Sequence, residues 1–160
     1  MRFIGNIIEK LQRHPKRVVF PEGTEPRILQ AARQFYALRL GAPIVLGNPA
    51  KVTEIAEGLN TSIEGIRIID PVESEDLDNF AKRFLSLRRA KGIRATEARE
   101  AVLQPNYFGT MMVAMHQADG LVSGASHITG SVLRPLFQIV KAAPDIRPSA
   151  WCIATIIVPK

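Results

Sequence analysis

The sequence predicts an α/β fold in which a mainly parallel sheet carries helices on both faces. Short apolar runs alternate along the chain with longer segments whose apolar residues recur at helical spacing. Glycine or proline stands close to most of the short runs, as expected where buried strands stop. Helices between the strands supply the crossovers that a parallel sheet requires. At 160 residues, the chain is long enough for one domain with a substantial core.

The first half of the chain is expected to begin with an amphipathic helix. Its first segment, MRFIGNIIEKLQRHPKR, mixes charged with apolar residues and lacks the continuous apolar stretch of a signal peptide. Helical spacing predicts a second helix over Arg27–Leu40. Asn48 followed by Pro49 is an N-cap pattern, and the helix that it starts runs to about Gly58. The strands expected between these helices are Val18–Phe20, Ile44–Leu46 and Ile66–Ile69.

The second half is expected to be mostly helical. A long helix follows Ser74, with an inward face made of Leu77, Phe80, Ala81, Phe84 and Leu85. A short helix through Glu97–Leu103 leads to a helix over Tyr107–Ala118, whose methionine stripe is interpreted as core packing. A short strand through Leu121 is bounded by glycines, and a last helix is predicted over Ser131–Lys141.

Composition excludes several classes of protein. The chain is 46% hydrophobic and 22% charged, which is ordinary for a soluble globular protein. No apolar run approaches the roughly 18–20 residues of a membrane span, so no membrane contact is expected and the cytoplasm is the expected location. Cys152 is the single cysteine, which rules out an intramolecular disulfide and suggests a buried, inert thiol.

Basic residues concentrate in one segment. From Lys82 to Arg99 the chain has seven lysines and arginines against one glutamate, which equals its whole net charge of +6. Such a cluster forms a solvated helix face, binds nucleic acid or binds a polyanionic small molecule. Nucleic acid is the weaker interpretation, because no helix-turn-helix, zinc-finger or RRM pattern accompanies the charges.

The stretch ADGLVSGASHITGSVLRP, residues 118–135, combines the end of a strand, a polar loop and the start of a helix. Pro135 suits only the first turn of a helix, so the helix begins near Leu133 or kinks there. Arg134 is then close to a helix N-terminus, where unpaired N–H groups favour an anion such as phosphate. The alternative is a capped helix with a solvent-facing arginine. Neutral donors for the same anion are Ser126, Thr129 and Ser131.

Other chemistries lack their motifs. Neither the phosphate loop of nucleotide triphosphatases nor a G-x-G-x-x-G fingerprint occurs. The three histidines show no metal-ligand spacing, so no metal site is expected. Gly124-Ala125-Ser126 matches the start of a nucleophile elbow, G-x-S-x-G, but Ile128 stands at its last position and no acid followed by a histidine comes later. A hydrolase is therefore disfavoured.

Residues 106–144, NYFGTMMVAMHQADGLVSGASHITGSVLRPLFQIVKAAP, closely resemble the corresponding segment of phosphate acetyltransferases and phosphate butyryltransferases. Three earlier stretches resemble motifs of the same family in the family's order, namely VVFPEGTEPR, GAPIVLGNP and LSLRRAKGIRATEA. The resemblance implies the reversible reaction of acetyl-CoA with phosphate to give acetyl phosphate and CoA. It also implies a fold like that of isocitrate and isopropylmalate dehydrogenases. Coenzyme A and acetyl-CoA are substrates in this family, and no bound cofactor is implied.

The resemblance assigns roles to single residues. Arg134 matches an arginine of the family's phosphate and acyl-phosphate site, and Arg88 matches a second functional arginine, so both are candidate catalytic residues. Two positions depart from the family pattern: Ile128 stands where a hydroxyl residue is common, and Gly130 stands where alanine is common. The first departure removes one possible phosphate donor. The residues that the resemblance assigns to substrate binding are Ser126, His127, Thr129 and Ser131.

Family members are much longer than this chain and have a second domain that closes the cleft. The apolar run Trp151–Val158 is typical of a buried strand, yet the sequence stops two residues later. We therefore expect residues 1–148 to form the N-terminal α/β portion of such an enzyme. Residues 149–160 are expected to form the first strand of a missing second domain.

The resemblance implies small molecules as partners, namely acetyl-CoA, phosphate and acetyl phosphate, and a homo-oligomer when the protein has its full length. Three alternatives stay open at this point. The chain could be a non-catalytic remnant that binds phosphate or CoA, one half of a split enzyme, or part of a phosphate butyryltransferase.

Overall fold

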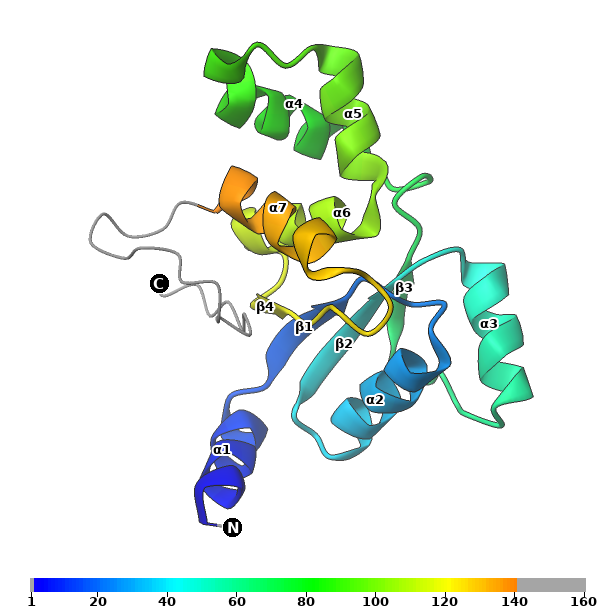
Figure 1. Ribbon diagram of the computed structural model, residues 1–160. Coiled ribbons are helices and arrows are strands. Elements are labelled where there is room, and N and C mark those ends of the chain that lie inside the picture. Colours follow the sequence, from blue (N-terminus) through cyan, green and yellow to red (C-terminus); the bar gives the residue numbers. More distant parts are fainter. Residues whose placement is uncertain (1, 141–160) are drawn as a thin grey trace.

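The computed structural model describes residues 2–140 (Figure 1). The expected strand Trp151–Val158, the single cysteine Cys152 and the boundary expected at residue 148 lie outside the described residues. Strands and helices alternate over residues 2–69, and the segment 77–114 is helical before the last strand, as predicted.

Four parallel strands form one sheet with the order β3-β2-β1-β4. The strands are β1 (Lys16–Phe20), β2 (Gly41–Leu46), β3 (Arg67–Ile69) and β4 (Gly120–Leu121). The helices are α1 (Arg2–Arg13), α2 (Pro26–Ala37), α3 (Pro49–Gly58), α4 (Leu77–Arg88), α5 (Ala95–Leu103), α6 (Pro105–Ala114) and α7 (Thr129–Ile139), and a 3-10 turn, η1 (Arg89–Lys91), follows α4. The predicted α/β class and the parallel sheet are confirmed.

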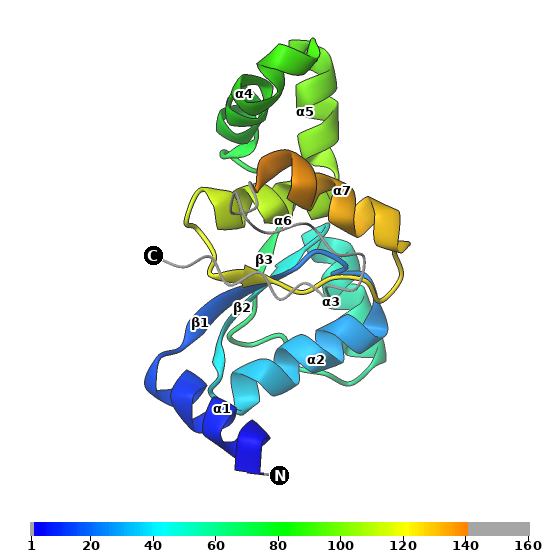
Figure 2. The same cartoon turned by 60° about the vertical axis from the view of Figure 1, so that its left-hand side comes forward.

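Helices cover both faces of the sheet, and neighbouring residues of β1 point to opposite faces, as the period of a strand requires. Phe20 belongs to a cluster with Leu29 of α2 and Val52 of α3. Val19 belongs to a larger cluster with Phe108 and other residues of α6. Figure 2 shows α2 and α3 on one side of the strands and α6 on the other.

The helices α4 and α5 extend the larger cluster away from the sheet, at the top of Figure 1. Two aromatic pairs join α4 to α6. The ring centroids of Phe80 and Phe108 are 5.0 Å apart, and those of Phe84 and Tyr107 are 5.4 Å apart. Such offset or edge contacts add about 0.5–1.5 kcal/mol to the burial of the rings. They hold the C-terminal end of α4 near α6 and α7.

The helix α6 differs from its predicted limits at both ends. It begins at Pro105, which suits a first-turn position because proline has no N–H to leave unpaired. It ends at Ala114, before His116 adopts a left-handed backbone with φ 60°. Met111 and Met112 are fully buried, which confirms that the methionine stripe is core packing.

Gly23 brings the segment after β1 close to the end of β2. Its N–H donates to the carbonyl oxygen of Leu46 over 3.1 Å. A Cβ atom at Gly23 would lie 2.3 Å from Cγ1 of Val45 and 2.4 Å from the Leu46 carbonyl oxygen. No side chain fits there without movement of the backbone. This close approach fixes the path of the chain beside Glu22.

We predict that Gly23→Ala destabilises the protein by about 1–3 kcal/mol, because the added methyl group overpacks this contact. Gly58 is the matched control, since it lies at the end of α3 and a Cβ atom there meets nothing within 4 Å. Gly58→Ala should leave stability unchanged or raise it by about 0.4–1 kcal/mol. Urea denaturation followed by circular dichroism measures both effects. Equal stability of the two variants would contradict the close approach.

Candidate functional site

The carboxyl ends of β1 and β4 meet at one edge of the sheet, because the two strands are adjacent and parallel. Glu22 follows β1 by two residues, and Ser123 follows β4 by two residues. In open parallel sheets, ligands bind beyond the carboxyl ends of the strands. The loop between β4 and α7, residues 122–128, therefore lies where a ligand is expected.

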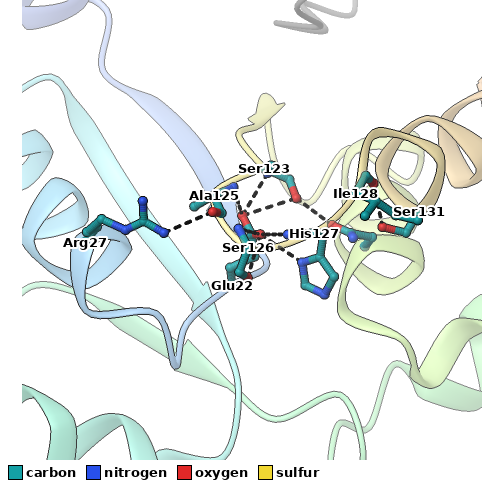
Figure 3. Close-up of polar contacts among 10 residues, drawn as sticks. Glu22, Arg27, Ser123, Ala125, Ser126, His127, Ile128 and Ser131 are labelled. Atoms are coloured by element: carbon teal, nitrogen blue, oxygen red, sulfur yellow. Dashed lines mark hydrogen bonds and ion pairs between the residues drawn. The ribbon is translucent and has the colours of Figure 1, made fainter.

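A buried carboxylate, that of Glu22, organises this loop (Figure 3). Its oxygen Oε2 accepts hydrogen bonds from the N–H groups of Gly124 and Ala125 at 2.8 and 2.9 Å. Its oxygen Oε1 accepts from the N–H groups of Ser126 and His127 at 2.7 and 2.9 Å. The Glu22 side chain is only 1% exposed. Four consecutive backbone groups are thus satisfied by one side chain.

Side chains of the loop complete the cage around the carboxylate. The hydroxyl of Ser126 donates to Oε1 over 3.0 Å, and Nδ1 of His127 lies 2.9 Å from the same oxygen. The hydroxyl of Ser123 donates to Oδ1 of Asn106 over 2.8 Å, which ties the loop to α6.

The Glu22 carboxylate is ionised in this cage. Burial alone would raise its pKa, but the backbone N–H groups of Ser126, Ala125 and Gly124, together with His127, more than reverse this effect. The net result is a pKa well below the usual range of a glutamate. The loop therefore folds around a fixed negative charge that belongs to the protein.

Arg27 forms a second link between the two loops. Its guanidinium group donates to the carbonyl oxygen of Ala125 over 3.0 Å and to Oε1 of Glu25 over 2.7 Å. Both contacts lie at the surface, where the Arg27 side chain is 70% exposed, so this link is weaker than that of Glu22.

The helix α7 begins at Thr129, two residues before the predicted helix Ser131–Lys141 and four residues before Leu133, the start in one of the two alternatives that Pro135 left open. Pro135 lies inside α7, and Arg134 occupies the sixth position of the helix instead of its first turn. The expectation that Arg134 lies next to the helix N-terminus is therefore corrected. The hydrogen bonds of Glu22 hold the backbone up to His127, and the helix begins directly after this held segment, with Ile128 as its N-cap residue.

The three predicted hydroxyl residues differ in whether the hydroxyl group donates a hydrogen bond within the protein. The Ser126 hydroxyl donates to Glu22, and the Ser131 hydroxyl donates to the carbonyl oxygen of Ile128 over 2.8 Å. Thr129 is exposed at the first position of α7. Among the three hydroxyls, Thr129 is the one for which the structure records no internal acceptor within residues 2–140.

The two candidate catalytic arginines lie on the two helices that contact Tyr107, α4 and α7. Burial raises the pKa of the Tyr107 hydroxyl, and the positive charges of Arg134 and Arg88 act in the opposite direction. The Tyr107 hydroxyl donates to Oε1 of Gln138 in α7 over 2.9 Å, and its ring packs against Phe84 of α4. Arg134 lies one helical turn before Gln138, and Arg88 lies one turn after Phe84, so each arginine is on the helix face that contacts Tyr107. Within residues 2–140, neither arginine has an ion pair with a carboxylate.

The rest of the basic segment is largely solvated. Arg94 pairs with Glu97 at 2.8 Å, and Arg99 pairs with Asp78 at 3.2 Å, all with exposed side chains. Arg88 is half-buried, whereas its neighbour Arg89 is exposed. Arg88 is therefore less exposed than the other basic residues of this segment.

Sequence reasoning missed Glu22 and Tyr107. The signal for Glu22 was a single acidic residue in Pro21-Glu22-Gly23, directly after a buried strand. Its partners are backbone N–H groups about a hundred residues later in the chain, and a residue pattern does not show them. Tyr107 precedes the methionine stripe in α6 and has the same apolar surroundings.

Neither a membrane-spanning helix nor a metal-binding cluster occurs among the described residues. In this range, no helix combines the length and the apolar character needed to cross a membrane. Nor do three or more potential metal-ligating side chains gather at any point of residues 2–140.

The fold and the site together define a class: a parallel α/β protein with a polar loop beyond the carboxyl ends of its strands and with an arginine on each of two helices that contact Tyr107. The chain belongs to the phosphate acetyl/butaryl transferase family, whose model matches residues 2–155. Similar curated proteins are phosphate acetyltransferases, at 46% identity in Thermoanaerobacterium thermosaccharolyticum and at 37% in Bacillus subtilis. These matches cover 92% and 91% of this chain and 44% and 45% of the relatives.

Solved structures give the same result. The EutD phosphotransacetylase from Staphylococcus aureus is 40% identical with a TM-score of 0.81, over 89% of this chain and 43% of that chain. A phosphotransacetylase from Streptococcus pyogenes is 35% identical with a TM-score of 0.84, over 90% and 44% of the two chains. The present chain thus spans less than half the length of the relatives that it matches.

We predict that Glu22→Gln lowers the free energy of unfolding at pH 7 by about 1–3 kcal/mol, because buried donors lose a charged acceptor. The effect depends on pH. Below about pH 4.3, the ordinary glutamate value, the unfolded chain binds a proton that the folded chain does not, so wild-type stability falls with acidification.

The Glu22→Gln variant lacks this contribution, so its stability should depend less steeply on pH below about 4.3. The control is Glu57→Gln, since Glu57 is an exposed residue of α3. Urea denaturation at several pH values between neutral and acid measures the slopes. If Glu22→Gln and wild type lose stability equally on acidification, the ionised Glu22 carboxylate does not stabilise the folded loop.

Proposed function

We propose that the chain forms the phosphate-binding wall of a phosphate acetyltransferase, an enzyme that transfers an acetyl group reversibly between CoA and phosphate. The observation that carries this proposal is the placement of Arg88 and Arg134, each one helical turn from a residue that contacts Tyr107: Phe84 of α4 and Gln138 of α7. It occurs in a chain whose relatives, at 36–46% identity, bear the name phosphate acetyltransferase. Within the described residues no carboxylate pairs with either arginine, so both charges can meet an anion.

The proposed work of the arginines is electrostatic. Two guanidinium groups neutralise phosphate in the ground state and the charge that develops on its oxygens as the acetyl group moves. Well-placed donors of this kind contribute a few kcal/mol each to the stability of a transition state. Thr129 and His127 are exposed in the same part of the chain and are proposed to contact the anion, whereas Ser126 and Ser131 hold the loop through their internal hydrogen bonds.

A second wall is proposed to complete the site. Transfer requires the thiol of CoA, the acetyl carbonyl group and phosphate to be aligned, and such alignment accounts for about 7–11 kcal/mol of a barrier. We propose that residues 1–148 are one portion of the enzyme and that residues 149–160 begin the next domain. The proposed setting is a cytoplasmic homo-oligomer with small-molecule substrates and without a bound cofactor. The isocitrate and isopropylmalate dehydrogenase-like topology likewise stays a prediction.

The test is an assay of acetyl-CoA formation from acetyl phosphate and CoA. It compares this chain with a protein in which the chain is extended to the length of its relatives. The extended protein should turn over acetyl phosphate, and the 160-residue chain should show negligible activity. If butyryl phosphate is a better substrate than acetyl phosphate, the extended protein is a phosphate butyryltransferase. No transfer of any short-chain acyl group by the extended protein would refute it and favour a non-catalytic binding role.

In the extended protein, Arg134→Ala should lower turnover roughly tenfold to a thousandfold, through a loss of about 1.4–4 kcal/mol of transition-state stabilisation. Arg88→Ala should have an effect of the same order. Arg89→Ala is the matched control, because Arg89 is exposed next to Arg88 and should change turnover little. Steady-state kinetics and thermal melts of the three variants check the prediction. Unchanged kinetics for a folded Arg134→Ala protein would show that Arg134 is a solvent-facing arginine without a role in catalysis.

A further inference from the structure

The contact between Glu22 and His127 fixes more than the shape of the loop. Oε1 of Glu22 lies 2.9 Å from Nδ1 of His127 and also accepts two N–H groups and one hydroxyl group. These partners of the carboxylate are donors. The carboxylate is buried and ionised, so it can only accept hydrogen bonds.

An acceptor at Nδ1 determines the tautomer of a neutral histidine. Since the hydrogen bond requires a hydrogen on Nδ1, the second ring nitrogen, Nε2, has a free lone pair and no hydrogen. The reverse tautomer would place two lone pairs against each other at 2.9 Å. Glu22 therefore makes neutral His127 an acceptor on its outer side.

The outer side of His127 faces away from the cage. The side chain is 39% exposed, and in Figure 3 the ring points its second nitrogen away from the Glu22 carboxylate. No contact of Nε2 with a protein atom is recorded in the range 2–140. His127 stands two residues before Thr129, the first residue of α7. A ligand that contacts Thr129 at the start of α7 thus has an acceptor next to it, in a site that otherwise offers donors.

We infer that Glu22 is a positioning residue that fixes His127 as a hydrogen-bond acceptor, and that the site thereby selects a protonated oxyanion, such as hydrogen phosphate, over a fully ionised one, such as sulfate. Hydrogen phosphate keeps a P–OH group that can donate to Nε2. Sulfate has the same shape and charge but no proton, so its oxygen would face a lone pair. The inference rests on the anion site of the proposed function and adds the selectivity of that site.

The selectivity arises because Nε2 of neutral His127 can only accept a hydrogen bond, so the ligand must donate one. A site built to accept a hydrogen bond discriminates strongly against a ligand that cannot donate one, because the acceptor then stays unpaired. Thr129 does not discriminate, since a hydroxyl group both donates and accepts. Arg88 and Arg134 donate to either anion alike. His127 is therefore the residue of this group that can tell the two anions apart.

The test measures binding of inorganic phosphate and inorganic sulfate to the chain by NMR, through the amide signals of the loop. It is done at about pH 8, above the ordinary imidazole pKa of about 6.5, where imidazole is mainly neutral. Wild type should bind phosphate about tenfold more tightly than sulfate, which corresponds to about 1.4 kcal/mol. The nitrogen shifts of the His127 ring should show hydrogen on Nδ1 and none on Nε2.

In Glu22→Gln, the side-chain amide can also donate to Nδ1, which allows hydrogen on Nε2, so the preference for phosphate should largely disappear. His127→Gln alters an exposed side chain and should also abolish the preference, even if Glu22→Gln does not fold. The matched control is Glu25→Gln, because Glu25 lies in the same loop but pairs with Arg27. This control should keep both the tautomer and the preference.

Four results would overturn the inference. Equal affinity of wild type for the two anions, or hydrogen on Nε2 in wild type, would refute the selectivity and leave the anion site of the proposed function intact. A preference that survives in a folded His127→Gln protein would do the same. Binding of neither anion would refute the anion site on this chain, and the selectivity with it.

Discussion

The hydrogen bonds between the Glu22 carboxylate and four consecutive N–H groups are the constraint on which the rest of the site depends. A loop between a strand and a helix normally leaves such groups to water or to a ligand. In this protein a side chain from the adjacent strand end satisfies them, and its burial makes the contact costly to break. The loop is therefore built before any ligand arrives, and the ligand meets what remains: the outer edge of His127, the start of α7 and the two arginines.

The same constraint relates the sheet to the arginines. Gly23 allows the segment after β1 to approach β2, which places Glu22 under the loop after β4. The loop leads directly into α7, where Arg134 lies one turn before Gln138, the residue that accepts the Tyr107 hydroxyl. On the other side, tilted and edge-to-face aromatic contacts hold the end of α4, and with it Arg88, against α6. The site is thus assembled from four separate segments, each fixed by packing or by hydrogen bonds of its own.

Much of the fold could be predicted from sequence, because strands and helices differ in apolar period and their order leaves few topologies. Arg88 and Arg134 could be singled out from motifs and resemblance, whereas their common neighbour Tyr107 looked like core. Of the two alternatives that Pro135 left open, the helix start near Leu133 was wrong, because a local sequence signal does not include a carboxylate that fixes the preceding loop. Glu22 was missed for the same reason, since its partners are backbone N–H groups far along the chain, and almost every residue type has such a group.

The central claim is that Glu22 is buried and ionised beneath the loop, and carbon NMR of its side-chain carboxyl group during an acid titration tests this most directly. We expect the Glu22 signal to stay at its ionised position as the pH falls through about 4.3, the ordinary pKa of a glutamate. The loop amide signals should stay in place over the same pH range. A Glu22 signal that titrates with this ordinary pKa would contradict the claim.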